Sequence, residues 1–227
     1  MYQFKEEINC DLFFRFPRNL VLSGKWAELP LASKSIYPVI GIHCDKHGHC
    51  FPSQETIAIM SGIKDVKTVR VGIEGLNILS EFSSIKRPNR RGQWHYEYKI
   101  IPPANHRGSM FPFYRSYVEG GNWAVLGSVS KAVYPVIKTF AYYDHEDCTE
   151  DDCPDYSTRD YDIANPDFEV VAEYAGVCLP SVKKAMVEIE KAELIDTDTD
   201  LNDGWRVHRL PKRTFKRDYL NNKFPPK

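Results

Sequence analysis

Apolar residues between positions 66 and 79 recur at spacings of three and four, which predicts the buried face of a helix. These residues are Val66, Val69, Ile73, Leu76 and Leu79. Pro52 and Ser53 can open an earlier helix, because a serine at a helix start accepts hydrogen bonds from free backbone N–H groups. Ser61-Gly62 ends that helix, since glycine tolerates left-handed backbone. The segment 51–79 therefore predicts two helices joined by a tight turn.

The opposite face of the later helix is polar and mostly cationic. It carries Lys64, Lys67, Thr68, Arg70 and Val71. A buried stripe backed by a short cationic and hydroxyl face is what a recognition helix needs to enter the major groove of DNA. We therefore expect these five residues to face base edges, and we expect Ser53 and Gln54, at the start of the earlier helix, to hold a phosphate.

The flanking segments complete a recognisable unit. Residues 14–18 and 20–22 look extended, and residues 32–44 predict a leading helix. Alternating residues over 80–85 and 94–101 predict a β-hairpin. Its tip carries four basic residues, Lys86, Arg87, Arg90 and Arg91, which can reach phosphates or a minor groove. A leading helix, a helix-turn-helix and a hairpin describe a winged helix.

The pattern returns later in the chain. Thirteen identical residues recur at a constant offset of 97, including Trp26 with Trp123 and Tyr-Pro-Val-Ile at 37–40 and 134–137. The offset then becomes 114, which places a 17-residue insertion between the first two helices of the second copy. We interpret this recurrence as a tandem duplication of a domain. The predicted fold class is thus α+β, mainly α, with two tandem winged-helix domains.

The second copy differs in charge. Its presumed recognition helix keeps Lys183 and Lys184 as candidate DNA contacts but also carries Glu188, Glu190 and Glu193. Its hairpin, predicted over 194–199 and 205–210, carries Asp196, Asp198, Asp200 and Asp203. Because these carboxylates would repel phosphates, this copy could instead bind a protein or a second copy of the chain. Contact with the DNA backbone through the two lysines and the basic tail stays open.

The net charge of −1 hides an uneven distribution. Residues 144–167 hold ten acidic residues against Arg159, a net −9, so the rest of the chain carries +8. A basic body suits a nucleic-acid binder better than the overall balance suggests. For the acidic insertion we expect a solvated disordered loop, with a partner-binding segment or a DNA mimic as alternatives.

Metal and enzymatic chemistry have weaker support. Residues 43–50, HCDKHGHC, contain zinc ligand types, but the spacing is not a usual tetrahedral set, and a turn is the better interpretation. The six cysteines form no obvious disulfide framework. We find no nucleophile elbow, phosphate-cradling glycine loop or paired-carboxylate motif. We expect no metal, no cofactor and no enzymatic activity.

Residues 14–101 resemble the helix-turn-helix domains of phage and plasmid replication initiators. The resemblance lies in F-x-R-x-P-R-x-L, W-x-x-L, S-K-x-x-Y-P-V-I, D-x-x-G-x-C-F-P-S-x-x-T-I-A-x-x-S-G and T-V-R-x-G-I-x-x-L. Related winged-helix domains occur in bacterial regulators and primosome-type proteins. Tandem winged helices are typical of plasmid initiators, which bind repeated origin sites, so the resemblance implies a similar role here.

These observations predict a cytoplasmic, sequence-specific binder of double-stranded DNA with no membrane span. We expect a first domain at 1–101, a linker at 102–110, a second domain at 111–211 with the acidic insertion at 144–167, and a basic tail at 212–227. Replication initiation is the first choice of role, and transcriptional regulation is the alternative with the same binding mode. A protein-interaction scaffold is the alternative from another class. A homodimer, or a replication or transcription partner held by the second domain, is also possible.

Overall fold

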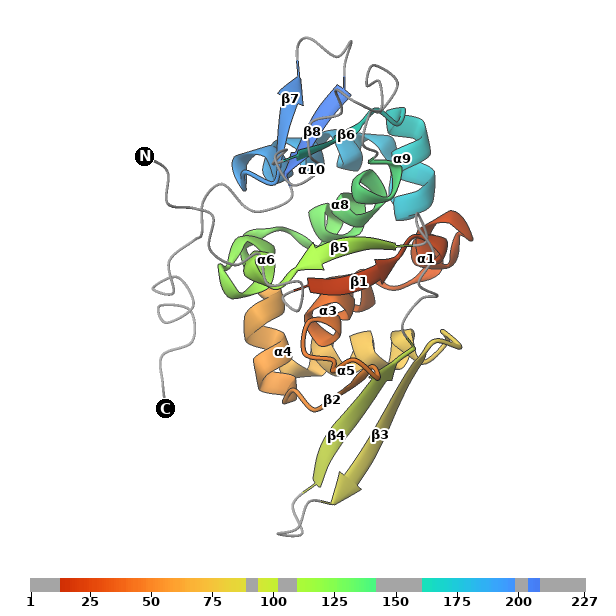
Figure 1. Cartoon of the computed structure of the whole chain (residues 1–227), viewed down its shortest axis with the longest axis vertical. Coiled ribbons are helices and arrows are strands. Elements are labelled where there is room, and N and C mark those ends of the chain that lie inside the picture. The colour runs from red at the N-terminus through yellow and green to blue at the C-terminus, as the bar shows by residue number, and fades with distance from the viewer. Residues whose placement is uncertain (1–12, 89–93, 102–109, 142–160, 199–203, 209–227) are drawn as a thin grey trace, which may run out of the picture.

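The computed structural model describes residues 13–88, 94–101, 110–141, 161–198 and 204–208 (Figure 1). We call residues 13–101 the first half and residues 110–208 the second half. The first half contains, in chain order, β1 Phe13–Pro17, α1 Arg18–Leu22, α2 Lys25–Glu28, α3 Leu31–Gly41, β2 His49–Cys50, α4 Gln54–Ser61, α5 Val66–Leu76, β3 Phe82–Pro88 and β4 Trp94–Ile100.

The second half repeats this order. Its elements are β5 Met110–Tyr114, α6 Arg115–Glu119, α7 Asn122–Val125, α8 Ser128–Phe140, β6 Tyr161–Ala164, α9 Phe168–Ala175, α10 Leu179–Lys191, β7 Ile195–Asp198 and β8 Gly204–His208. Each half has a sheet in which a hairpin is extended by a third strand, in the orders β2-β4-β3 and β6-β8-β7. Among the described elements, each one of the first half therefore has a counterpart in the second.

The two helices predicted from the pattern over 51–79 are α4 and α5. The side chain of Ser53 accepts a hydrogen bond from the backbone N–H of Thr56, which confirms the predicted cap of α4. Gly62 follows α4 with a left-handed φ of 67°, as the glycine signal predicted. Asp65 caps α5 by accepting from the N–H of Lys67. Short capping side chains thus begin both helices, and the turn between them runs from the left-handed Gly62 to the cap Asp65.

The two halves meet through β1 and β5, which pair antiparallel with Arg15 opposite Pro112. Pro112 lies 97 positions after Arg15, so the pairing is symmetric about these two residues. The indole N–H of Trp26 donates to the carbonyl of Ala132, and that of Trp123 donates to the carbonyl of Ser35. Both donors and both acceptors are again 97 positions apart. The halves are therefore packed as two similar units around an approximate two-fold axis.

One apolar core runs through both halves. Phe16 stacks on Phe111 with a ring separation of 4.7 Å, and α3 packs on α8 beneath the β1–β5 pair. At the turns that follow α4 and α9 the halves approach closely: a methyl group added at Gly62 would overlap the carbonyl oxygen of Ala124, and one added at Gly176 would overlap that of Ala27. The turns are therefore wedged against the opposite half.

Three details differ from the sequence prediction. Residues 20–22 were expected to be extended but form the end of α1, because Leu20 and Val21 are buried on one side of a single turn. The expected insertion over 144–167 contains β6, which pairs with β8, so residues 161–164 are not a disordered loop. Met110, expected in the linker, begins β5.

The remaining segments match the prediction closely or lie outside the described residues. The leading helix α3 spans 31–41 rather than 32–44, and both hairpins are present. The linker at 102–109, most of the acidic insertion and the tail at 212–227 lie outside the described part of the chain. No helix in the described residues is long and apolar enough to cross a membrane.

Candidate nucleic-acid interface

Helix α5 presents the polar face that the sequence predicted. Val69, Gly72, Ile73 and Leu76 are buried against the rest of the first half. The exposed residues of this segment include the predicted Lys64, Lys67, Thr68, Arg70 and Val71, together with the acidic Asp65 and Glu74. The three cations and the hydroxyl can donate to base acceptors, and the exposed valine can contact a thymine methyl group. The face is therefore open and has the chemistry of a major-groove reader.

Arg70 is held by Gln54, the first residue of α4. The Arg70 Nε donates to Gln54 Oε1 over 3.0 Å. Gln54 is only 9% exposed, and its Nε2 has no hydrogen-bond partner among the described residues. Gln54, predicted to touch a phosphate, thus lies beneath the arginine and orients the guanidinium. Its direct contact with a phosphate remains a prediction.

The start of α4 carries Ser53, an exposed residue whose hydroxyl also contacts Thr56 Oγ1 at 3.0 Å. The first N–H groups of a helix lack intrahelical acceptors and attract anions. Ser53 and the start of α4 therefore form a possible phosphate contact beside Arg70. Lys64, in the turn before α5, adds an exposed positive charge.

The β3–β4 hairpin carries Lys86 and Arg87 on its outer part, and both residues are exposed. Arg87 Nε pairs with Glu97 Oε2 at 2.9 Å, and the other oxygen of Glu97 lies 3.3 Å from His49 Nδ1. Lys86 Nζ lies 5.6 Å from the ring centre of Trp94. Arg90 and Arg91 lie outside the described residues. Of the two predicted basic residues that the structure describes here, Lys86 and Arg87, the charge of Arg87 is therefore partly neutralised by Glu97.

The second half places Lys183 and Lys184 on the exposed side of α10. Glu188, expected to repel phosphates, instead turns inward, where it accepts from the N–H of Gly127 and the hydroxyl of Ser130. Lys183 Nζ lies 6.0 Å from the ring centre of Phe168. One of the carboxylates expected to repel phosphates is therefore held by hydrogen bonds within the second half. The hairpin keeps the expected Asp196, while Asp200 and Asp203 lie outside the described part.

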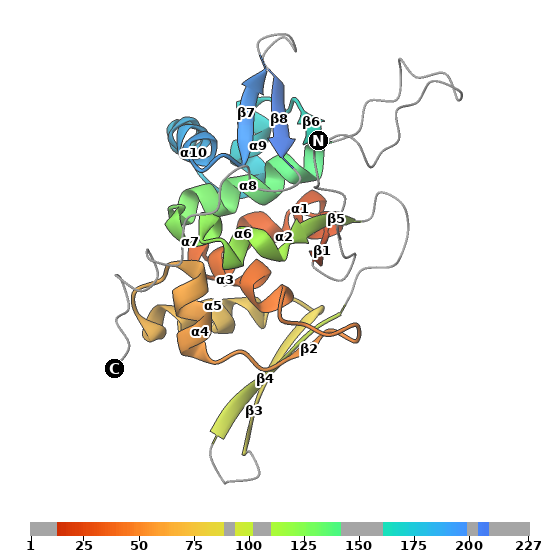
Figure 2. The ribbon, with the colours of Figure 1, turned by 60° about the vertical axis from the view of Figure 1, so that its left-hand side comes forward.

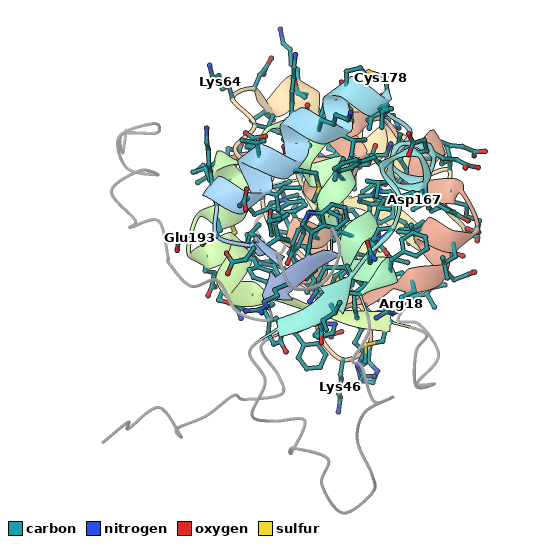
Figure 3. The ribbon with its side chains drawn as sticks, turned by 90° about the horizontal axis from the view of Figure 1, so that it is seen from above. Arg18, Lys46, Lys64, Asp167, Cys178 and Glu193 are labelled. Atoms are coloured by element: carbon teal, nitrogen blue, oxygen red, sulfur yellow. The ribbon has the colours of Figure 1, made fainter. Side chains whose placement is uncertain are left out.

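Figure 3 views the molecule from above and labels residues near the turns that precede α5 and α10. Lys64, which precedes α5, and Cys178, the N-cap of α10, lie at the same edge of the molecule, opposite Lys46. The starts of the two equivalent helices thus open on one side. The structure brings together Ser53, Gln54 and Arg70, and places Lys183 and Lys184 on α10 of the other half.

The cysteine and histidine segment at 43–50 forms a turn. Asp45 Oδ1 accepts from the backbone N–H groups of His49 and His47, which hold the pKa of Asp45 below its ordinary value. The thiols of Cys44 and Cys50 lie 3.2 Å apart, and this contact together with burial raises the pKa of Cys50. Within the described residues, no group of three or more potential ligands could hold a metal ion. The hydrogen bonds that Asp45 accepts from His47 and His49 therefore agree with the interpretation of this segment as a turn.

Two features escaped sequence reasoning. Gln54 was identified as polar, but its burial under Arg70 depends on how α4 crosses α5, which periodicity does not reveal. Trp94 shares a face of β4 with the buried Tyr98 and Ile100, yet it is exposed because the hairpin extends beyond the helices (Figure 1). The length of the hairpin could have predicted this exposure, since a strand of seven residues reaches past a short helix.

Comparison with protein families finds a helix-turn-helix domain at residues 27–77. The match covers α3, α4 and α5 and the second half of α2, so it includes Gln54, Arg70 and the turn at Gly62. No curated protein and no solved structure gave a significant match. The first half therefore contains a domain of a type that binds DNA, positioned where the sequence pattern predicted it.

Proposed function

We propose that this protein binds double-stranded DNA in a sequence-specific manner, with α5 as the recognition helix. The observation that carries the proposal is the exposed cationic face of α5, with Arg70 fixed by Gln54, inside a helix-turn-helix domain. A guanidinium held in one orientation can make two hydrogen bonds to guanine, the commonest specific base contact. An arginine free to rotate would contribute charge but less discrimination.

In the proposed complex, α5 lies in the major groove and the start of α4 contacts the sugar-phosphate backbone through Ser53. Lys64, Lys67, Thr68 and Val71 line the groove beside Arg70. Lys86 and Arg87, with Arg90 and Arg91 of the hairpin tip, reach the adjacent backbone or minor groove. Such contacts position the protein, whereas those of α5 specify the sequence.

We further propose that the chain is a tandem duplication of a winged helix. The supporting observation is that equivalent residues make equivalent contacts in both halves, as Trp26 and Trp123 do. In this view Lys183 and Lys184 contact the DNA backbone from the second half. A homodimer, or a replication or transcription partner bound through the second half, stays an alternative use of that surface.

Replication initiation is our first choice of biological role, because the motifs in residues 14–101 resemble those of phage and plasmid initiators. Transcriptional regulation by the same binding mode is the close alternative. The proposal includes no enzymatic activity and no cofactor, and it places the protein in the cytoplasm with the DNA. A winged-helix scaffold for proteins is the alternative from a different class.

The test is a selection from random duplex DNA, repeated at two salt concentrations. Specific binding predicts an enriched sequence and a steep loss of affinity with salt, because cations on the protein displace counterions from phosphates. The spacing of any repeated element would show whether one half or both contact DNA. No enrichment and no retained duplex would refute DNA recognition and favour the scaffold.

A further inference from the structure

The β3–β4 hairpin carries a ladder of aromatic rings that runs outward from the core. Tyr98, Tyr96 and Trp94 lie on one face of β4 because alternate residues of a strand share a face. Tyr98 is buried, Tyr96 is half-buried and stacks on Tyr98 with a ring separation of 6.1 Å, and Trp94 is 64% exposed. Figures 1 and 2 show that the outer part of the hairpin stands clear of the helices.

Trp94 differs from the other three tryptophans of the chain. Trp26 and Trp123 are fully buried, and Trp205 is 8% exposed. Leaving a ring of this size in water forgoes much of the stabilisation that burial gives a large aromatic side chain. Folding of the core therefore does not explain why a tryptophan occupies this position.

Positive charge surrounds the exposed ring. Lys86 Nζ lies 5.6 Å from the centre of the Trp94 ring, an arrangement in which the cation is attracted by the ring face. Lys86 pairs with Tyr96 across the hairpin, and Pro88 pairs with Trp94, so all four residues share one face. The carboxylate of Glu97 lies on the other face, paired with Arg87. The Trp94 face thus combines an aromatic ring with the ammonium group of an exposed lysine, which forms no ion pair among the described residues.

We propose that Trp94 is a DNA-contacting residue that stacks on a nucleobase exposed at a distorted or opened step, while Lys86 contacts the neighbouring phosphate. The proposal rests on the proposed function, since it assumes that α5 brings the hairpin to DNA. Every base offers a π face, so stacking adds affinity without reading a sequence. Apolar side chains of minor-groove proteins act similarly when they enter a base step and unstack it.

Charge favours DNA over a protein as the occupant of this face. The ammonium group of Lys86 lies close to the ring, and the hairpin tip that precedes Trp94 in sequence carries Arg90 and Arg91. A base step next to its own phosphates presents an aromatic surface and a negative charge at neighbouring positions. The Trp94 face presents the complementary pair.

Intrinsic fluorescence offers a direct test, because Trp94 is the one strongly exposed tryptophan among the four. Wild-type protein is titrated with the selected duplex, with the same duplex carrying two mismatched base pairs under the hairpin, and with one single strand. Stacking predicts quenching of the exposed component on at least one of these DNAs. A 2-aminopurine base placed at the mismatch reports stacking from the DNA side.

Variants separate stacking from general contact. Trp94→Ala should weaken binding of the DNA that quenches the fluorescence by about 5- to 150-fold, whereas Trp94→Phe should keep most of the affinity. Ile85→Ala is the matched control, because Ile85 is also exposed but lies on the other face of the hairpin. It should change affinity by less than about twofold. Thermal unfolding of each variant checks that the hairpin is retained.

The DNA on which Trp94→Ala loses the most affinity shows which kind of exposed base the ring stacks on. A larger loss on the mismatched duplex than on the single strand indicates stacking at an opened step, and the reverse indicates capture of a single strand. The proposal is overturned if wild-type protein binds the selected duplex but none of the DNAs quenches the fluorescence and Trp94→Ala binds them all normally. Absence of any wild-type binding would instead refute the proposed function itself.

Discussion

Lys34 and Lys131 are buried lysines at equivalent positions, and each donates to the last carbonyl of a helix in the opposite half. Lys34 Nζ lies 2.8 Å from the carbonyl oxygen of Ala175, which ends α9. Lys131 Nζ lies 2.8 Å from that of Ser61, which ends α4. Helix ends have unpaired carbonyl groups and a partial negative charge, so an ammonium group stabilises them. Each half therefore caps the C-terminal end of a helix in the other.

Burial lowers the pKa of Lys34 from 10.5 to about 8. Between these values the unfolded chain holds a proton that the folded protein has released, so stability from this residue rises with pH. We expect the free energy of unfolding of wild-type protein, minus that of Lys34→Met, to increase between pH 8 and 10.5. The increase should be on the order of 3 kcal/mol at most. Urea denaturation across this pH range measures the difference.

The comparison between variants is needed because buried tyrosines act in the opposite direction. Burial raises the pKa of Tyr37 and of Tyr134, so the unfolded chain ionises first and both proteins lose stability at high pH. This loss cancels in the difference. Lys67→Met, at an exposed position, is the control for removing a lysine charge from the surface. A difference for Lys34→Met that stays constant with pH would contradict the assignment.

Gly62 tests the close approach of the halves. Its φ of 67° disfavours any side chain, and an added methyl group would overlap the backbone of Ala124. Gly24 has a φ of 79° but no atom within 4 Å of such a methyl group. Gly24→Ala should therefore cost about 1 kcal/mol from backbone strain alone, and Gly62→Ala about 1–3 kcal/mol more from overpacking. Equal losses in chemical denaturation would show that the turn is not wedged.

The shared core predicts that the halves do not fold separately. A fragment of residues 1–101 would expose Phe16 and Trp26, which pack against the second half or bond to it. We expect full-length protein to unfold in one transition and the fragment to show no cooperative unfolding in near-ultraviolet circular dichroism. Two transitions in the intact chain, or a cooperative fragment, would support the predicted division into independent domains instead.

The hydrogen bond between Gln54 and Arg70 predicts that the two residues act together. Gln54→Leu removes the hydrogen-bond acceptor and replaces the buried amide side chain with an apolar one of similar size. In a double-mutant cycle on the selected duplex, Gln54→Leu and Arg70→Ala should show a coupling of about 0.5–3 kcal/mol. Gln54→Leu with Lys67→Ala, which share no hydrogen bond, should be additive. Additive losses for the first pair would mean that Gln54 does not orient Arg70.

Local patterns were enough to predict α4, α5 and the hairpins. Ser53 and Gly62 mark the ends of α4 by chemistry that acts over a few residues, and the apolar spacing of α5 reports its own buried face. The identical residues at an offset of 97 predicted that two similar units follow one another. The family match over 27–77 falls on the helices expected to contact DNA.

Long-range contacts were beyond the reach of the pattern. The pairing of Phe14 with Phe113 and the bond from Lys34 to Ala175 join residues about 100 or more positions apart, and repeats in a sequence do not say how their units pack. The turn of α1 at Leu20 and Val21 was taken for a strand because a short apolar run fits either structure. The inward direction of Glu188 depends on Ser130, a residue of another helix.

The most direct test of the account is the affinity of Arg70→Ala for the selected duplex and for a scrambled duplex of equal length. Base reading by Arg70 predicts a loss of about 1–3 kcal/mol on the selected sequence and a much smaller loss on the scrambled one. Arg15→Ala, which removes an exposed guanidinium from β1, is the control and should leave both affinities unchanged. Equal losses on both duplexes for Arg70→Ala would contradict sequence recognition by α5.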